Sequence, residues 1–195
     1  HSLDENYIDD YMDLAKDYLG FLQRQKEAGR IRHIGFSSHA TPDVLKRFLN
    51  WYDGFDMALI QLNYLDWTLL DAKRQYELLS EHHIPVWVME PLKGGRLSTL
   101  NEAAAEILQA ASPGSSLSSW GLRYLMGLPN VQVILSGMSA VEQVVAGIGT
   151  VDILVNNAGI YVVRMFVDTD EALWRRLTDV NYIGFLAMTH AVVPK

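Results

Sequence analysis

A proline- and glycine-rich run at residues 91–95, Pro-Leu-Lys-Gly-Gly, carries residues that could hold a phosphate group. Lys93 provides a positive charge, and Arg96 adds a second one just after the run. Gly94 can take a left-handed backbone conformation, which opens main-chain N–H groups to a ligand. These two glycines are more typical of a loop that needs a left-handed backbone, and a contact to a phosphate-bearing small molecule is the alternative.

A second run, Ser136-Gly-Met-Ser139, has the residues of a helix start that binds anions. Gly137 lets the main chain approach a ligand closely, and Ser139 with Glu142 has the spacing of a capping box. The first N–H groups of such a helix have no partner within the helix, so they can point at a phosphate. Farther along, Asn156, Asn157 and Gly159 form a turn that is more typical of a braced strand end than of a binding site.

Composition excludes several other chemistries. The chain has 195 residues, no cysteine, a formal net charge of -7 and a pI near 5.3. Thiolate and disulfide chemistry are thereby excluded, and His82-His83 has no third ligand at metal spacing, so we predict no metal site. No basic stripe favours nucleic acid or an anionic membrane as a partner. No apolar run reaches the length of a membrane span and no signal peptide is present, so we expect a soluble, cytoplasmic protein.

Helices and strands alternate along the chain, which predicts an α/β fold with parallel strands. The continuous apolar run at 55–62 is typical of a strand buried on both faces. Strands are expected at 30–36, 55–62, 85–89, 131–135 and 151–155, and helices at 7–29, 44–51, 70–83, 101–111, 117–127, from 139, and from an Asp168 cap to about 193.

Four motifs in the first three quarters of the chain resemble the second half of an aldo-keto reductase barrel. They are Gly29–Ser38 (GRIRHIGFSS), Ile60–Tyr64 (IQLNY), Val88–Gly95 (VMEPLKGG) and Leu135–Gln143 (LSGMSAVEQ). The resemblance implies that the first four strands are barrel strands five to eight. It also implies that their carboxyl ends bind NADP(H), as a TIM barrel places its active site there.

This resemblance implies roles for particular residues. Ser37 and Gln61 would lie beside the nicotinamide amide, and the runs 91–95 and 136–139 would line the phosphates. The family's catalytic Asp, Tyr and Lys belong to the first barrel half and have no counterpart here. His1 matches the catalytic histidine, but we expect it to be a frayed chain end without a catalytic role. Since no Lys or Arg lies between Ser136 and Gln143, the sequence does not favour NADP over NAD.

From about Gly149 onward, the chain resembles the middle of a short-chain dehydrogenase/reductase. Val151–Gly159 (VDILVNNAG) looks like that family's fourth strand with its Asn-Asn-Ala-Gly turn, and Asp179–Gly184 (DVNYIG) follows at the expected distance. The resemblance implies that Asn156 and Gly159 lie beside the cofactor. The family's glycine-rich loop and its Ser and Tyr-x-x-x-Lys residues have no counterpart, and no Tyr in the chain has a Lys four residues later.

We therefore interpret residues 1–195 as a single domain composed of two fragments, about 1–146 and 147–195, with a joint near 144–149. Four barrel strands alone would leave an open inner face, with residues such as Ile34 and Leu59 on it. We expect the fifth strand to return to the other side of the sheet, which gives a five-stranded, doubly wound flavodoxin- or Rossmann-like sandwich. The alternative is a half TIM barrel completed by a homodimer.

The predicted function follows from this composition. We expect an engineered chimera of oxidoreductase fragments that has no catalytic residues of its own, is not an enzyme and requires no cofactor. One alternative is residual weak binding of NADP, NAD or another phosphate-bearing molecule, through Ser37, Gln61, Lys93, Gly94, Ser136, Gly137, Ser139, Asn156 and Gly159. A second is a natural truncated NADP-dependent reductase that needs a partner chain.

Overall fold

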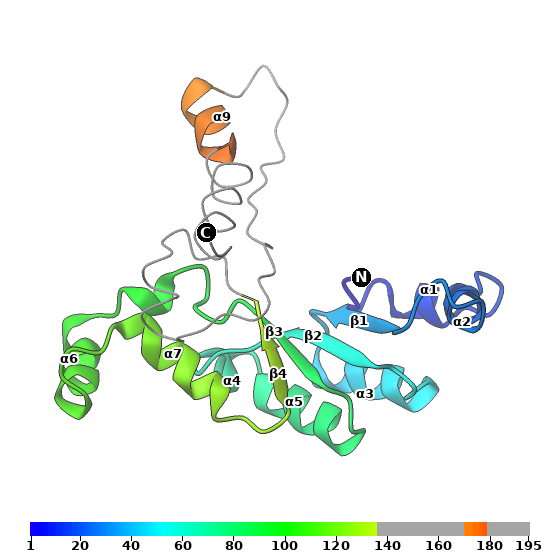
Figure 1. Ribbon diagram of the computed structural model, residues 1–195, viewed down its shortest axis with the longest axis horizontal. Coiled ribbons are helices and arrows are strands. Elements are labelled where there is room, and N and C mark those ends of the chain that lie inside the picture. The colour runs from blue at the N-terminus through cyan, green and yellow to red at the C-terminus, as the bar shows by residue number, and fades with distance from the viewer. Residues whose placement is uncertain (136–169, 179–195) are drawn as a thin grey trace, which may run out of the picture. The chain divides into compact units, whose positions relative to one another are not determined.

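The computed structural model describes residues 1–135 and 170–178 (Figure 1). The chain divides into two compact units, His1–Ile134 and Leu135–Lys195, and each is described by itself. The predicted joint near 144–149 and the predicted strand 151–155 lie outside the described residues.

The first unit is built on a four-stranded parallel sheet. Its strands are β1 (Gly35–Ser38), β2 (Met57–Gln61), β3 (Val86–Met89) and β4 (Val131–Ile134). They lie in the order β1-β2-β3-β4, so each strand neighbours the next one in the sequence. Each crossover between parallel strands is right-handed as a rule, and strands that advance in one direction therefore keep their helices on one face. The α/β class and the first four strands are confirmed, while the fifth strand and the doubly wound arrangement stay predictions.

Helices connect these strands as the alternation predicted. The crossover helices are α3 (Pro42–Trp51), the short α4 (Asp66–Leu69), α5 (Ala72–Glu81), the 3-10 turn η1 (Arg96–Ser98), α6 (Glu102–Ala111) and α7 (Leu117–Met126). Figure 1 shows α3 and α5 on the same face of the sheet. The side chain of Asn101 caps α6 by accepting a hydrogen bond from the Ala104 N–H at 2.9 Å.

The predicted single helix at 7–29 is wrong, because the chain forms two helices there, α1 (Ile8–Met12) and α2 (Tyr18–Glu27). Asp13 adopts an extended conformation and its carboxylate accepts from the Ala15 N–H at 2.8 Å. This local hydrogen bond competes with helical ones and ends α1. Gly29, with φ of 70°, follows the end of α2 as the sequence predicted.

Alternation along the strands places the core on the helix side of the sheet. Ala58 and Ile60 of β2 and Val86 of β3 are fully buried there, whereas Leu59 on the opposite face is half-buried. Ile34 was expected on that opposite face, and this is wrong, because Ile34 is 3% exposed and belongs to the core. Ile34 lies two residues before Phe36, and residues two apart in an extended chain point to the same face. Ile34 therefore faces the core together with Phe36, whose ring packs against Phe48 and Phe55.

The described part of the second unit is α9 (Glu171–Thr178). The Asp170 side chain accepts a hydrogen bond from the Leu173 N–H at 2.8 Å and so caps the helix, in place of the predicted Asp168. Arg175 pairs with Glu171 one turn earlier on the exposed surface. Across residues 1–135 and 170–178, every helix is too short or too polar to cross a membrane.

Candidate functional site

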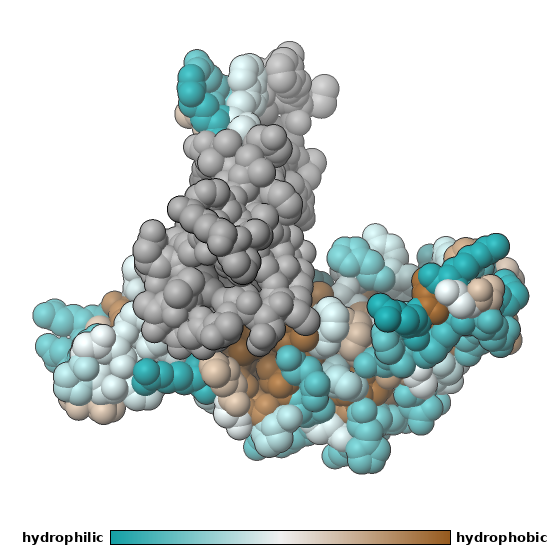
Figure 2. All heavy atoms as spheres, viewed as in Figure 1, coloured by the Kyte–Doolittle hydropathy of each residue, from teal (hydrophilic) through white to brown (hydrophobic). Residues whose placement is uncertain are grey.

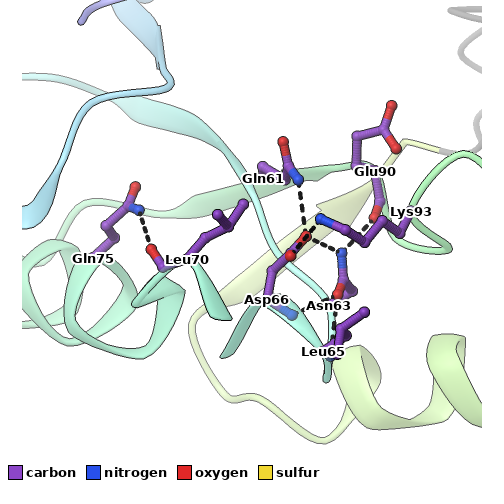
Figure 3. Close-up of polar contacts among 8 residues, drawn as sticks. All are labelled: Gln61, Asn63, Leu65, Asp66, Leu70, Gln75, Glu90 and Lys93. Atoms are coloured by element: carbon purple, nitrogen blue, oxygen red, sulfur yellow. Dashed lines mark hydrogen bonds and ion pairs between the residues drawn. The ribbon is translucent and has the colours of Figure 1, made fainter. Parts of the chain in front are cut away.

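A buried carboxylate, Asp66, organises the carboxyl ends of β2 and β3 (Figure 3). Lys93 Nζ lies 2.5 Å from Asp66 Oδ1. Gln61 Nε2 and Asn63 Nδ2 donate to Asp66 Oδ2 at 2.8 and 2.7 Å. The side chain of Asn63 also accepts from the Asp66 N–H at 2.8 Å and donates to the Glu90 carbonyl at 3.0 Å. We call Gln61, Asn63, Asp66 and Lys93 the Asp66 cluster, and it joins the ends of two neighbouring strands.

The Asp66 cluster holds its carboxylate ionised. Burial raises the pKa of Asp66, but hydrogen bonds from Lys93, Gln61 and Asn63 and the charge of Lys93 outweigh burial, so the pKa lies below its ordinary value. A buried charge is tolerated when it is paired and hydrogen-bonded, and Asp66 meets both conditions. Asp66 is therefore an acceptor at neutral pH and has no proton to give to a substrate.

Two residues predicted to contact a cofactor, Gln61 and Lys93, are both in this cluster. The Lys93 side chain is only 17% exposed and its ammonium group is neutralised by Asp66. Its charge is thus already paired within the protein, which leaves less of it for a phosphate. The structure brings Gln61 and Lys93 together through the Asp66 carboxylate, which the sequence analysis did not single out.

The loop after β3 provides exposed groups that could hold an anion. Gly94 and Gly95 have φ angles of 61° and 87°, so glycine suits both positions. The Gly94 N–H has no hydrogen-bond acceptor within the described part of the chain. Arg96 is exposed and makes no ion pair with any residue of 1–135 or 170–178. An open N–H beside an unpaired guanidinium group is an arrangement that attracts phosphate oxygens.

Ser37, which was also predicted to contact the cofactor, lies within β1 near its carboxyl end. The first residues of the chain form hydrogen bonds with it. Its Oγ accepts from the Ser2 N–H at 2.7 Å and lies 3.1 Å from His1 Nδ1. Leu3 pairs with Ser38 in a parallel β-bridge, and its N–H donates to the Ser37 carbonyl at 2.7 Å. The expectation of a frayed end at His1 is therefore wrong, because three consecutive residues are anchored to the edge of β1.

The other predicted site residues lie outside the described residues. These are Ser136, Gly137, Ser139, Asn156 and Gly159. In the part of the chain that the structure describes, no three His, Asp or Glu side chains are grouped so as to hold a metal ion.

Asn63 and Asp66 are the functional candidates that sequence reasoning missed. Asn63 follows a buried strand, and Asp66 comes three residues later, a spacing at which an Asn side chain commonly accepts from nearby N–H groups. That pattern predicts a local turn. It does not predict burial of the carboxylate, which depends on Lys93 arriving from the next strand.

Comparison with protein families finds two matches. The aldo/keto reductase family matches residues 4–158, and the short chain dehydrogenase family matches residues 130–195. The predicted two-part composition is confirmed. The two matches overlap at 130–158, and the predicted joint near 144–149 falls within this overlap.

Individual relatives show the same division. A solved structure of the aldo-keto reductase AKR11C1 from Bacillus halodurans (holo form) aligns with a TM-score of 0.58 and 25% identity, covering 75% of this chain and 52% of that chain. The peroxisomal multifunctional enzyme type 2 of Drosophila melanogaster is 39% identical over 61 residues, and the dehydrogenase/reductase SDR family member 7B of Xenopus tropicalis is 41% identical over 56 residues. These cover 31% and 29% of this chain but only 10% and 18% of the curated proteins.

Proposed function

The chain belongs to the aldo/keto reductase family through residues 4–158, and we propose that it keeps a weak nicotinamide-nucleotide site without reducing carbonyl compounds by itself. The site lies at the carboxyl end of β3, where the loop 91–96 would receive the phosphate groups. An engineered chimera of two oxidoreductase fragments would account for the presence of two family matches in one chain. The short-chain dehydrogenase part contributes no separate activity to this proposal.

The observation that carries the proposal is the exposed loop after β3, where the Gly94 N–H and the Arg96 side chain have no partner among residues 1–135 and 170–178. Lys93 has a different role, because its ammonium group is bound to Asp66. By fixing the start of the loop to the end of β2, Lys93 holds the Gly94 N–H in place. The proposal therefore separates a phosphate-binding residue, Arg96, from a positioning residue, Lys93.

Calorimetric titration with NADPH tests this site. We expect dissociation constants in the high micromolar to millimolar range, and about a three- to tenfold weakening in Arg96→Ala, because one charge-assisted hydrogen bond to an exposed phosphate is lost. Arg32→Ala is the matched control, since Arg32 is also exposed and lies before the amino-terminal end of β1. Absence of binding at millimolar NADPH, or an equal loss in both variants, would contradict the proposal.

The proposal that the chain alone does not reduce carbonyl compounds is tested by a separate experiment. No tyrosine of the chain has a lysine four residues later, and the alignment covers only 52% of the length of the reductase AKR11C1. We expect no sustained oxidation of NADPH at 340 nm with a carbonyl substrate. Sustained turnover by a monomer would overturn this part of the proposal.

The second candidate is a truncated reductase that needs a partner chain. It is favoured by one observation, the alignment that covers 52% of the length of AKR11C1. Size-exclusion chromatography separates the possibilities. A monomer contradicts completion by a homodimer, whereas a dimer that oxidises NADPH supports it.

A further inference from the structure

An apolar cavity of about 270 Å³ lies beside the edge of β1 to which residues 1–3 are anchored, and it shares no residue with the Asp66 cluster or the loop after β3. One wall comes from β1 and α3, with the rings of Phe36, Phe48 and Trp51. The other wall comes from α2, with Tyr18, Phe21 and Leu22. Aromatic side chains dominate both walls, and such surfaces favour flat, apolar ligands.

The wall formed by α2 is open to solvent. Tyr18 and Phe21 are 49% and 55% exposed, and no residue of α2 is buried. Figure 2 shows hydrophobic residues scattered among hydrophilic ones over the region of α1 and α2. The helix therefore does not pack closely onto β1, and a small molecule can enter from its side.

The side chain of Ser37 lies at the sheet side of this cavity. Ser37 is 8% exposed, and its Oγ accepts from the Ser2 N–H at 2.7 Å. Ser37 Oγ also lies 3.1 Å from His1 Nδ1, and the tautomer of His1 decides which of the two groups donates. A serine hydroxyl has one proton and two lone pairs, so these two contacts leave it one free hydrogen-bonding position. A ligand hydroxyl group, which can both donate and accept, can fill that position.

We propose that this cavity binds a two-ring aromatic molecule that carries one hydroxyl group. A dry apolar cavity of about 150 Å³ holds a single benzene ring. The present cavity has nearly twice that volume, so two fused rings fit it better than one. The rings lie between the walls of α2 and α3, and the ligand hydroxyl group forms a hydrogen bond with the Ser37 hydroxyl group. The lining of this cavity shares no residue with the loop 91–96 of the proposed nucleotide site.

Isothermal titration calorimetry of the full chain with 2-naphthol and with naphthalene tests the proposal. We expect saturable binding of one molecule per chain, with 2-naphthol about three- to tenfold tighter, because of one added hydrogen bond in a largely buried setting. In Ser37→Ala, the preference for 2-naphthol should disappear while naphthalene still binds. Naphthalene thus reports whether the cavity itself survives the substitution.

A second pair of variants checks the location. Leu22→Trp fills the cavity from the α2 side and should weaken both ligands at least tenfold. Leu69→Trp places the same side chain on exposed α4, outside the cavity, and should leave binding unchanged. Equal effects of the two tryptophan variants, non-saturable binding, or an unchanged preference in Ser37→Ala would each overturn the proposal. Circular dichroism confirms that each variant is folded.

Discussion

Replacing Lys93 with methionine is expected to lower the free energy of unfolding by about 3 kcal/mol at pH 7, as is usual when one partner of a buried ion pair is removed. Asp66 is fully buried, and Lys93 is the only cation in contact with it within the described residues. Methionine keeps most of the apolar length of the side chain, so the loss reports the missing charge. Urea denaturation followed by circular dichroism measures it.

Two further variants separate this effect from general damage. Asp66→Asn in the Lys93→Met background removes the stranded charge and should recover most of the stability, which a double-mutant cycle reports as coupling. Lys73→Met is the surface control, because Lys73 lies 3.7 Å from Glu77 with both side chains about half exposed. It should change stability by less than about 0.5 kcal/mol. If the double variant is no more stable than Lys93→Met, the ion pair is not the cause.

The pH dependence has a definite sign. The pKa of Asp66 is lower in the folded protein than in the unfolded chain. The ionised Asp66 therefore stabilises the folded state above the ordinary carboxyl pKa, and this stabilisation is lost as the pH falls through the folded-state pKa. In Lys93→Met the hydrogen bond and the charge of Lys93 no longer lower the pKa of Asp66, whereas burial still raises it. Asp66 therefore takes up a proton more readily in this variant. The stability difference between wild type and Lys93→Met should therefore shrink from pH 7 to pH 4. A difference that stays constant over this range would contradict the assignment.

Replacing Leu79 with alanine is expected to lower the free energy of unfolding by about 2–5 kcal/mol. Leu79 is fully buried on α5 in the core beneath the sheet. The substitution removes buried apolar surface and leaves a cavity that rigid strands cannot close. Domains of this size are stable by only about 5–15 kcal/mol, so the variant should approach the unfolding threshold.

Leu69→Ala provides the matched comparison, because Leu69 on α4 is 63% exposed. It should change stability by less than about 0.5 kcal/mol. Both variants should keep the denaturant dependence of the wild type, since the same surface is exposed on unfolding. Similar losses for Leu79→Ala and Leu69→Ala would contradict the described core.

Much of the first unit could be predicted from sequence because its cues are local. Apolar runs bounded by turn residues predicted four strands, and their parallel order follows from the intervening helices. Gly29 and Pro42 marked helix boundaries through their backbone preferences. The strand at 30–36 was placed too early, since β1 spans Gly35–Ser38, because the apolar pattern does not fix where pairing with β2 begins.

The sequence by itself determined that two oxidoreductase families meet in this chain, because their motifs are short, ordered stretches of neighbouring residues. Only the tertiary structure decided what those residues contact. The sequence predicts that Lys93 contacts a phosphate, but in the structure its ammonium group neutralises Asp66. The neighbouring strands β2 and β3 bring these two residues together although they are 27 positions apart. The sequence predicts a frayed chain end at His1, but in the structure the first residues are anchored. The Ser2 N–H donates to Ser37 Oγ, and Leu3 pairs with Ser38 at the edge of β1. Contacts across a sheet depend on strand order and register, and these are set by packing of the whole unit rather than by any single motif.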